Sequence, residues 1–201
     1  NTLLDVWGRS ATEAYAIGVD GTVLRWNGNA WSVMTTARGW ELWGIWGSAS
    51  NDLWMIGQNG VIVHYDGVAF TQVSSPTDFL ILGIWGSSAT DIWAVGINGL
   101  ILHYDGQGWS TPAQPTQRNL FAVWGRGPGD AYAVGNTGMI LKLTGTTWAP
   151  VQNVGSGQNL RAVWGDNAGR VVRAGWDGTV IRGSGNSWIT ETTSPALVTV
   201  W

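Results

Sequence analysis

Hydrophobic residues in this chain gather in short runs that recur at a nearly constant interval. In each interval one mostly apolar segment of five residues ends on a tryptophan that is followed by glycine. Successive tryptophans of these pairs are 39, 39, 39 and 40 residues apart, and a period near 40 indicates an array of one supersecondary unit. The five tryptophans are Trp7, Trp46, Trp85, Trp124 and Trp164.

The five-residue runs read LLDVW, LWGIW, ILGIW, LFAVW and LRAVW. Apolar residues occupy both alternating faces of each run, which predicts a strand that is buried on both sides. The middle residue is small in four copies, as expected for a strand close to a crowded central axis, whereas the first copy has Asp5. The small residues are Gly44, Gly83, Ala122 and Ala162.

Three further strands are predicted in every repeat. The second reads EAYAIG, DLWMIG, DIWAVG, DAYAVG and RVVRAG, and the third follows a G-x-x-G turn, as in GVIVHYDG. The third ends on Asn-Gly or Asp-Gly in three copies, a signature of two-residue hairpin turns. A short fourth strand is centred on an aromatic residue in each copy, namely Trp31, Phe70, Trp109, Trp148 and Trp188.

Four antiparallel strands repeated about every 40 residues predict an all-β fold, a five-bladed β-propeller of four-stranded antiparallel blades. A β-sandwich is the alternative, but it does not require an aromatic residue at a fixed interval. We expect one domain over 1–201. The repeats cover about 3–41, 42–80, 81–119, 120–159 and 160–196, and 197–201 is a sixth copy of the first strand.

The sixth copy reads LVTVW, and we expect Leu197–Trp201 to compete with or replace Leu3–Trp7 beside the first blade. Such pairing would tie off a free strand edge. Deleting the segment is then expected to change the melting temperature or the oligomeric state. Otherwise the chain is expected to be a monomer, with strand exchange as a route to oligomers.

Composition narrows the functional classes. Charged residues make up 11% of the chain and the net charge is −3, so the basic footprint of a nucleic-acid-binding protein is missing. Cysteine is absent, which excludes disulfides and thiolate metal sites, and no apolar stretch approaches the length of a membrane span. A single lysine and Ser/Thr/Asn/Gly-rich loops favour an extracellular or cell-surface location.

The segment Trp85 to Trp109, WGSSATDIWAVGINGLILHYDGQGW, resembles a bacterial propeller repeat of the form W-G…AVG-x-x-G-x-I-L-H-Y-D-G-x-x-W. Such repeats are similar to those of BNR-like (Asp-box) propellers and of propellers of the photosystem II assembly-factor type. The resemblance covers nearly the whole chain and implies the propeller fold. The arginine triad, tyrosine nucleophile and acid/base carboxylate of sialidase-type members do not map onto this sequence, so sialidase activity is not implied.

Residues that recur in register are interpreted as structural. The Trp-Gly tryptophans are expected to form the core between blades. His64 and His103 share one register with three other basic residues. Four acids share another register, which argues against a catalytic pair because the two acids of such a pair need different environments. We therefore predict no enzyme activity, with a glycoside-active propeller as the alternative, and no catalytic residue, metal site or cofactor. The acids are Glu13, Asp52, Asp91 and Asp130.

Residues that break the repeat are the candidates for binding. Large aromatics in connections and turns have no core role by position, and amides and carboxylates share those turns. The face that carries the blade connections and the G-x-x-G turns is therefore predicted to bind a ligand without chemistry. The favoured ligand is a carbohydrate, as in a lectin; the alternative is a protein or peptide bound by an interaction scaffold or assembly factor. The predicted ligand-binding residues are Trp40, Phe79, Asn98, Asn119, Asn159, Trp176 and Asp177.

Overall fold

The computed structural model describes residues 1–36, 39–151, 157–166, 171–175, 178–184 and 187–192. Strands dominate these residues, and they form five separate four-stranded sheets. In each sheet the four strands are neighbours in chain order and pair antiparallel. Each sheet is therefore a meander, which is the predicted blade. The sixth copy of the first strand, at 197–201, lies outside the described residues.

The five sheets are called blades 1 to 5. Blade 1 consists of β1 (Leu3–Ser10), β2 (Glu13–Gly18), β3 (Thr22–Trp26) and β4 (Trp31–Thr36), and blade 2 of β5 (Leu42–Ala49), β6 (Asp52–Gly57), β7 (Ile62–Tyr65) and β8 (Phe70–Gln72). Blade 3 consists of β9 (Ile81–Ser88), β10 (Asp91–Gly96), β11 (Ile101–Tyr104) and β12 (Trp109–Ser110). Blade 4 consists of β13 (Leu120–Gly127), β14 (Asp130–Gly135), β15 (Ile140–Thr144) and β16 (Thr147–Pro150). Blade 5 consists of β17 (Leu160–Gly165), β18 (Val171–Gly175), β19 (Thr179–Ser184) and β20 (Ser187–Thr192).

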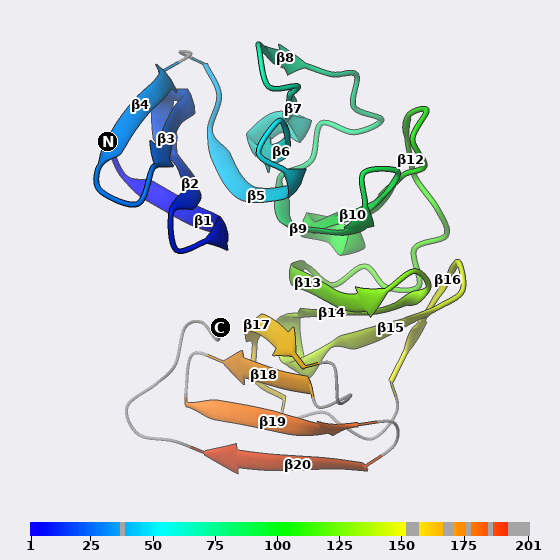
Figure 1. Cartoon of the computed structure of the whole chain (residues 1–201). Helices are drawn as coiled ribbons and strands as arrows, with labels where there is room; N and C mark the ends of the chain where they lie inside the picture. The colour runs from blue at the N-terminus through cyan, green and yellow to red at the C-terminus, as the bar shows by residue number, and fades with distance from the viewer. Residues whose placement is uncertain (37–38, 152–156, 167–170, 176–177, 185–186, 193–201) are drawn as a thin grey trace.

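The blades stand around a common axis, with the first strand of each innermost and the fourth outermost (Figure 1). The inner strands β1, β5, β9, β13 and β17 pack against one another in chain order and line a shared central channel. The structure thus confirms a five-bladed β-propeller, and the sandwich alternative is wrong. It also confirms the innermost position of the Trp-Gly strands, because a Cβ at Gly83 would come within 3.0 Å of the Ala122 Cα.

The hydrophobic core lies between blades rather than within one. Four clusters of fully buried side chains join blade 1 to 2, 2 to 3, 3 to 4 and 4 to 5. In the first of them, Tyr15 and Ile17 from blade 1 pack with Leu42, Leu53 and Met55 from blade 2. Because a sheet face must be covered, each blade depends on its neighbour for stability.

The Trp-Gly pair has a steric explanation. The indole of Trp7 extends over Gly47 of the next blade, and a Cβ on that glycine would meet Trp7 Cη2 at 3.2 Å. The same relation holds between Trp46 and Gly86. A tryptophan of one blade therefore needs a glycine in the next, which confirms the prediction that these tryptophans pack between blades.

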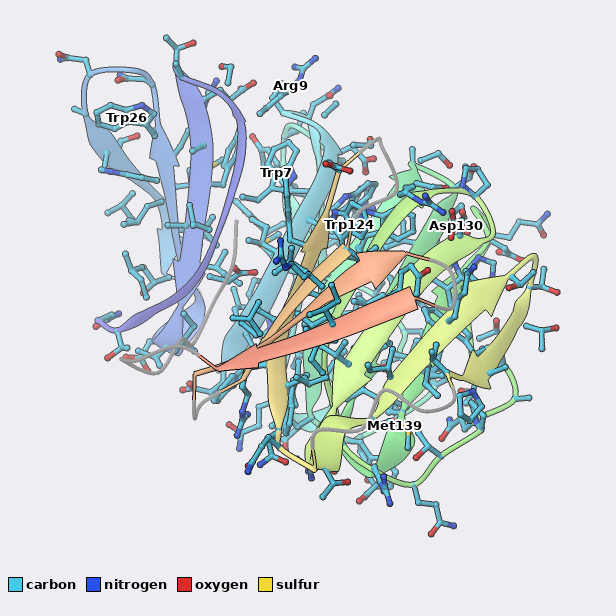
Figure 2. The ribbon with its side chains drawn as sticks, turned by 90° about the horizontal axis from the view of Figure 1, so that it is seen from below. Trp7, Arg9, Trp26, Trp124, Asp130 and Met139 are labelled. Atoms are coloured by element: carbon cyan, nitrogen blue, oxygen red, sulfur yellow. The ribbon has the colours of Figure 1, made fainter. Side chains whose placement is uncertain are left out.

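The propeller has two distinct faces. One carries the turns between first and second strands and is called the hairpin face; the other carries the G-x-x-G turns and the connections between blades and is called the connection face. Figure 2 shows Trp7, Arg9 and Asp130 toward the hairpin face and Met139, which follows a G-x-x-G turn, at the opposite face. The prediction that turns and connections share one face is confirmed, because the Gly21 N–H donates to the Trp40 carbonyl at 2.6 Å.

The G-x-x-G turns of blades 1 to 4 contain a non-glycine residue in the left-handed region, with φ between 51° and 58°. Asp20, Asn59 and Asn98 are of the kinds that tolerate it, whereas Thr137 is β-branched and strained there. In blade 2 the next residue, Gly60, must be glycine for two reasons. Its φ of 68° lies in the left-handed region, and a Cβ would collide with the Thr77 carbonyl in the connection to blade 3.

One sequence prediction needs correction. The inner strands are not buried on both sides. In β5, the ladder register shifts between Leu42 and Gly44, so Trp43 stands in a bulge and its side chain lines the channel, 39% exposed. Apolar residues on both strand faces are therefore distributed between the inter-blade core and an open channel, a difference that periodicity alone does not reveal.

Candidate functional site

The central channel is a hollow of about 340 Å³ that receives residues from the inner strands of all five blades. The five-residue run of each inner strand begins at the connection face, since its first residue pairs with the glycine before the G-x-x-G turn, as Leu42 pairs with Gly57. The second residue of each run consequently lies at the connection-face end of the channel. We call these five residues the channel ring: Leu4, Trp43, Leu82, Phe121 and Arg161.

The channel ring is apolar on four blades and cationic on the fifth. Leu4 and Trp43 are exposed despite their size, and Leu82 and Phe121 are half-buried. The Arg161 guanidinium lies over the Phe121 ring, with Cζ 3.8 Å from the ring centroid, a cation–π contact that holds the charge at the rim. Burial lowers the pKa of Arg161, but the side chain keeps its charge at neutral pH.

A carboxylate already occupies part of the channel. Asp5 Oδ1 accepts a hydrogen bond from the Val6 N–H at 2.9 Å, and Oδ2 accepts one from the Ile45 N–H of blade 2, also at 2.9 Å. Burial raises the pKa of the Asp5 carboxyl to about 6, because loss of hydration outweighs these two backbone bonds. The inner edge of the sheet thus binds an acceptor oxygen.

The other inner strands repeat this edge without the carboxylate. Ile84 pairs with Ala94 in the same register in which Ile45 pairs with Met55, so its N–H points to the same inner edge. The residue that would supply an acceptor to Ile84 is Gly44, in the position of Asp5. Gly44 has no side chain, so this position of blade 2 gives the Ile84 N–H no carboxylate acceptor.

Trp40, one of the predicted ligand residues, has a packing role. Its indole packs against the cluster between blades 1 and 2, and its N–H donates to Gln72 Oε1 at 3.2 Å. It lines an outer hollow of about 460 Å³ together with Met34, Tyr65 and Phe70. The indole thus lies between the outer strands of two blades and is not part of the channel ring.

The side chains of Asn119 and Asn159 bind backbone groups of the turns on the connection face. Asn119 Oδ1 accepts the Asn98 N–H at 2.9 Å, and Asn159 Oδ1 accepts the Thr137 N–H at 2.9 Å. Each amide precedes an inner strand and satisfies a backbone donor in the turn of the preceding blade. Their carbonyl oxygens are therefore engaged within the fold, although Asn98 is exposed beside a hollow of about 410 Å³ lined by glutamine and threonine.

The remaining predicted residues fall into two groups. Phe79 lies in the connection before β9 and is 43% exposed, with its N–H donating to Thr77 Oγ1 at 3.0 Å. Trp176 and Asp177 lie outside the described residues. The structure therefore brings Asn98 and Asn119 together on the connection face, and a ligand-binding role for the predicted set stays a prediction.

The hairpin face carries a side-chain network that repeats from blade to blade. Asp52 Oδ1 receives the Trp54 indole N–H at 3.1 Å and lies 2.7 Å from His64 Nε2, while Ser48 donates to Oδ2. Blade 3 has the same arrangement around Asp91. The shared acids thus bind side chains of the first, second and third strands of their own blade.

This network does not have the geometry of a catalytic triad. Serine and histidine both contact the carboxylate, so Asp52 stands between Ser48 and His64, and the imidazole is not placed to take the serine proton. The His64 ring also stacks on Trp54, with centroids 4.3 Å apart. The arrangement fixes the third strand against the second, consistent with the structural interpretation of the register that His64 and His103 share.

The residues that the structure describes contain no group of three or more His, Asp or Glu side chains close enough to hold a metal ion. They also contain no helix with the length and apolar character needed to cross a membrane.

The fifth blade differs from the others in its charged residues. Arg173 stands where the other blades have alanine or methionine, and it is fully buried with Cζ 4.9 Å from the centroid of Tyr132 of blade 4. Burial lowers the pKa of Arg173 to about 10, so the guanidinium stays charged at neutral pH. Blade 5 thus places one arginine in the interface with blade 4 and another, Arg161, in the channel ring.

The fold and channel define this chain as a five-bladed β-propeller with an apolar, partly cationic axial hollow. Among solved structures it is similar to "YCF48 bound to D1 peptide", with a TM-score of 0.72 and 16% identity over 95% of this chain and 67% of that chain. It is also similar to YCF48 from Cyanidioschyzon merolae, with a TM-score of 0.70 and 16% identity over 92% of this chain and 68% of that one. No protein-family profile and no curated protein matches the chain.

Sequence reasoning missed the channel ring. The second residue of each run was assigned to a buried face, because Leu4, Leu82 and Phe121 look like core residues. The available signal was Arg161, which places a charge in the same register and contradicts a buried position.

Proposed function

We propose that this propeller is a non-catalytic module that binds a peptide segment of another protein at the connection-face end of its channel. The observation that carries the proposal is the channel ring, in which exposed apolar side chains surround an open hollow beside one arginine. An apolar rim with few placed polar groups is typical of ligand sites, and a volume of about 340 Å³ lies near the lower end of their range, roughly 300 Å³.

The chemistry of the ring favours a peptide. Apolar side chains of a peptide can contact Leu4, Trp43 and Leu82, while its carbonyl or carboxylate oxygens can bind the inner-edge N–H groups and the Arg161 guanidinium. Asp5 supplies the precedent, because its carboxylate is bound by the same kind of N–H group. The similar YCF48 structure, whose title names a bound D1 peptide, supports a peptide over other ligands.

The carbohydrate interpretation gains no such support. It relied on Trp40 and on amides of the connection face, but the Trp40 indole packs between blades and the carbonyl oxygens of Asn119 and Asn159 bind neighbouring turns. A sugar site requires a free aromatic plane and free polar groups at its edge. We therefore favour the protein-interaction scaffold, which was the alternative from the sequence.

A peptide-display selection against the folded chain tests the proposal, with affinities of selected peptides measured by calorimetry. Trp43→Ala and Arg161→Gln are expected to weaken binding by roughly tenfold or more each, as for residues at the centre of an interface. Val68→Ala is the matched control, since Val68 is 90% exposed between β7 and β8, away from the channel. Circular dichroism establishes that each variant is folded.

Two results contradict the proposal. One is a selection that yields no peptide dependent on the channel ring. The other is a glycan panel that binds the wild type in a manner sensitive to Phe79→Ala but not to Trp43→Ala, which would restore the carbohydrate interpretation on the connection face.

A further inference from the structure

The five Trp-Gly tryptophans border the central channel at the end opposite the channel ring. Each is the fifth residue of its inner-strand run and the channel-ring residue is the second, so the two levels are roughly 10 Å apart along the strand. The tip of the Trp46 indole lies over Gly86 of the next blade and that of Trp85 over Gly125, so the indoles follow one another around the channel. We call this set the tryptophan ring: Trp7, Trp46, Trp85, Trp124 and Trp164.

The tryptophan ring is reached by water from the hairpin face. Its members from blades 1 to 4 are half-buried, and Trp7 lies toward that face in Figure 2. Within the described part of the chain the indole N–H groups of these four have no acceptor, and none of them is buried. By contrast, the indole N–H of Trp54, on a second strand, donates to a carboxylate. The ring is therefore accessible to a ligand and is not sealed inside the core.

One carboxylate lies in the channel wall next to the tryptophan ring. Asp5 is two residues before Trp7, and both side chains extend toward blade 2, where Asp5 Oδ2 accepts the Ile45 N–H. Each Asp5 oxygen accepts one backbone hydrogen bond, and a carboxylate oxygen has a second lone pair for another partner. Among the described residues that line the channel, only Asp5 and Arg161 are charged, and Arg161 lies at the other level, over the Phe121 ring.

We propose that the tryptophan ring binds an organic ammonium group, with its alkyl substituents against the indoles and its charge balanced by Asp5. Aromatic rings attract cations through the negative charge of their faces, tryptophan most strongly, and alkylated ammonium groups suit such an enclosure. This fold already places cations on its aromatic rings, since Arg161 lies over Phe121 and Arg25 Cζ lies 5.9 Å from the centroid of Tyr15. The ligand and the end of the channel both differ from those of the proposed peptide site.

The chemistry of the wall excludes other classes of ligand. Calcium and magnesium ions need roughly six or more oxygen ligands, whereas the ring offers one carboxylate among aromatic surfaces. An anion would be repelled by Asp5, and a neutral apolar molecule would leave that charge unbalanced. The hollow of about 340 Å³ is roughly ten times the ~30 Å³ share of a water molecule in the liquid, which is room enough for a trimethylammonium group.

The test is a titration of the full chain, isotope-labelled at its tryptophan nitrogens, with choline and with the neutral analogue that has carbon in place of the choline nitrogen. Indole N–H resonances report where each compound binds, and Trp85→Phe identifies one resonance of the ring. Choline is expected to shift resonances of the ring, and the neutral analogue is expected to bind roughly tenfold more weakly, because it lacks the attraction to the rings and to Asp5.

Two kinds of variant separate charge from burial. Asp5→Asn is expected to weaken choline binding by roughly tenfold, since the counter-charge is lost. Asp105→Asn is the matched control: it removes the same charge on an exposed hairpin turn where blade 1 has Asn27, and choline should bind it as it binds the wild type. Trp85→Leu should lose more affinity than Trp85→Phe, because leucine is apolar but has no aromatic face.

Circular dichroism reports whether each variant is folded, and the comparison of choline with its neutral analogue on the wild type needs no variant. Equal affinity for the two compounds overturns the inference, as does a choline affinity that Asp5→Asn leaves unchanged. Shifts confined to tryptophans outside the ring would place the ligand elsewhere and would also overturn it. Because no peptide is present in the titration, its result is independent of the peptide selection that tests the proposed function.

Discussion

Trp46 places the tip of its indole over Gly86 of the next blade, so closely that a Cβ on the glycine would lie 2.6 Å from Trp46 Cη2. The repeat therefore couples one residue of each blade to one residue of the next across a buried interface. A change on either side alters the spacing of two blades, which is why the pair recurs as a unit.

Gly86→Ala is accordingly expected to destabilise the protein by about 1–3 kcal/mol, the usual cost of forcing extra volume into a packed interface. Gly8→Ala is the matched control at the same register, where a Cβ has only ordinary contact with Ala14. Its effect should stay within about 0.5 kcal/mol. Urea unfolding of both variants measures the difference, and equal losses would show that the indole contact does not determine the requirement for glycine.

Thr137→Asn is expected to stabilise the fold. Thr137 has φ 51°, a left-handed conformation that costs a β-branched residue of the order of 1 kcal/mol, whereas blades 2 and 3 have asparagine in this place. The hydrogen bond that its backbone N–H donates to Asn159 Oδ1 does not use the Thr137 side chain and is kept. Thermal unfolding should show a rise of about 2–4 °C for about 1 kcal/mol in a domain of this size. Asn98→Thr, the reverse change in blade 3, should show a comparable fall.

Lys142→His is expected to stabilise blade 4. Asp130 Oδ1 is buried without a hydrogen-bond partner, while the equivalent oxygens of Asp52 and Asp91 lie 2.7 and 2.8 Å from a histidine Nε2. A histidine on β15 can reach the orphan oxygen and contribute about 1 kcal/mol. Calorimetric unfolding at neutral pH measures the gain; a lower melting temperature would mean that the Lys142 contact with the Tyr132 ring matters more.

The contribution of Asp5 to the free energy of unfolding should fall as pH rises from about 4 to 6. The folded carboxyl has a pKa of about 6 against an ordinary 3.8, so the folded state binds more protons than the unfolded state in this window. The stabilisation is complete below pH 3.8 and is lost as pH passes 6. Because the carboxylate is partly exposed, the expected loss is about 1–2 kcal/mol, below the ~3 kcal/mol of the full difference.

Asp5→Gly gives this channel position the residue found in blades 2 and 3 and removes the titrating group. The variant loses the bond to Ile45, so the comparison concerns the slope with pH and not the absolute stability. Parallel pH profiles of unfolding free energy for the two proteins between pH 4 and 6 would contradict the assignment to Asp5.

The sequence by itself determined the repeat, the strand order within each blade and the position of the inner strand. The Trp-Gly interval and the small residues Gly44, Gly83 and Ala122 were sufficient, because a periodic pattern reports which residues share an environment. The same logic correctly assigned the Trp-Gly tryptophans to the interfaces between blades.

Only the tertiary structure decided which apolar residues are exposed. Trp40 looked free and is packed, whereas Trp43 looked buried and lines the channel, since a bulge turns it away from the core. Leu3 and Leu42 are the same residue type at the same position of the repeat, yet Leu3 is exposed and Leu42 is fully buried. Burial depends on which blade stands next to a residue in space, so residues at equivalent positions of the repeat can differ in exposure.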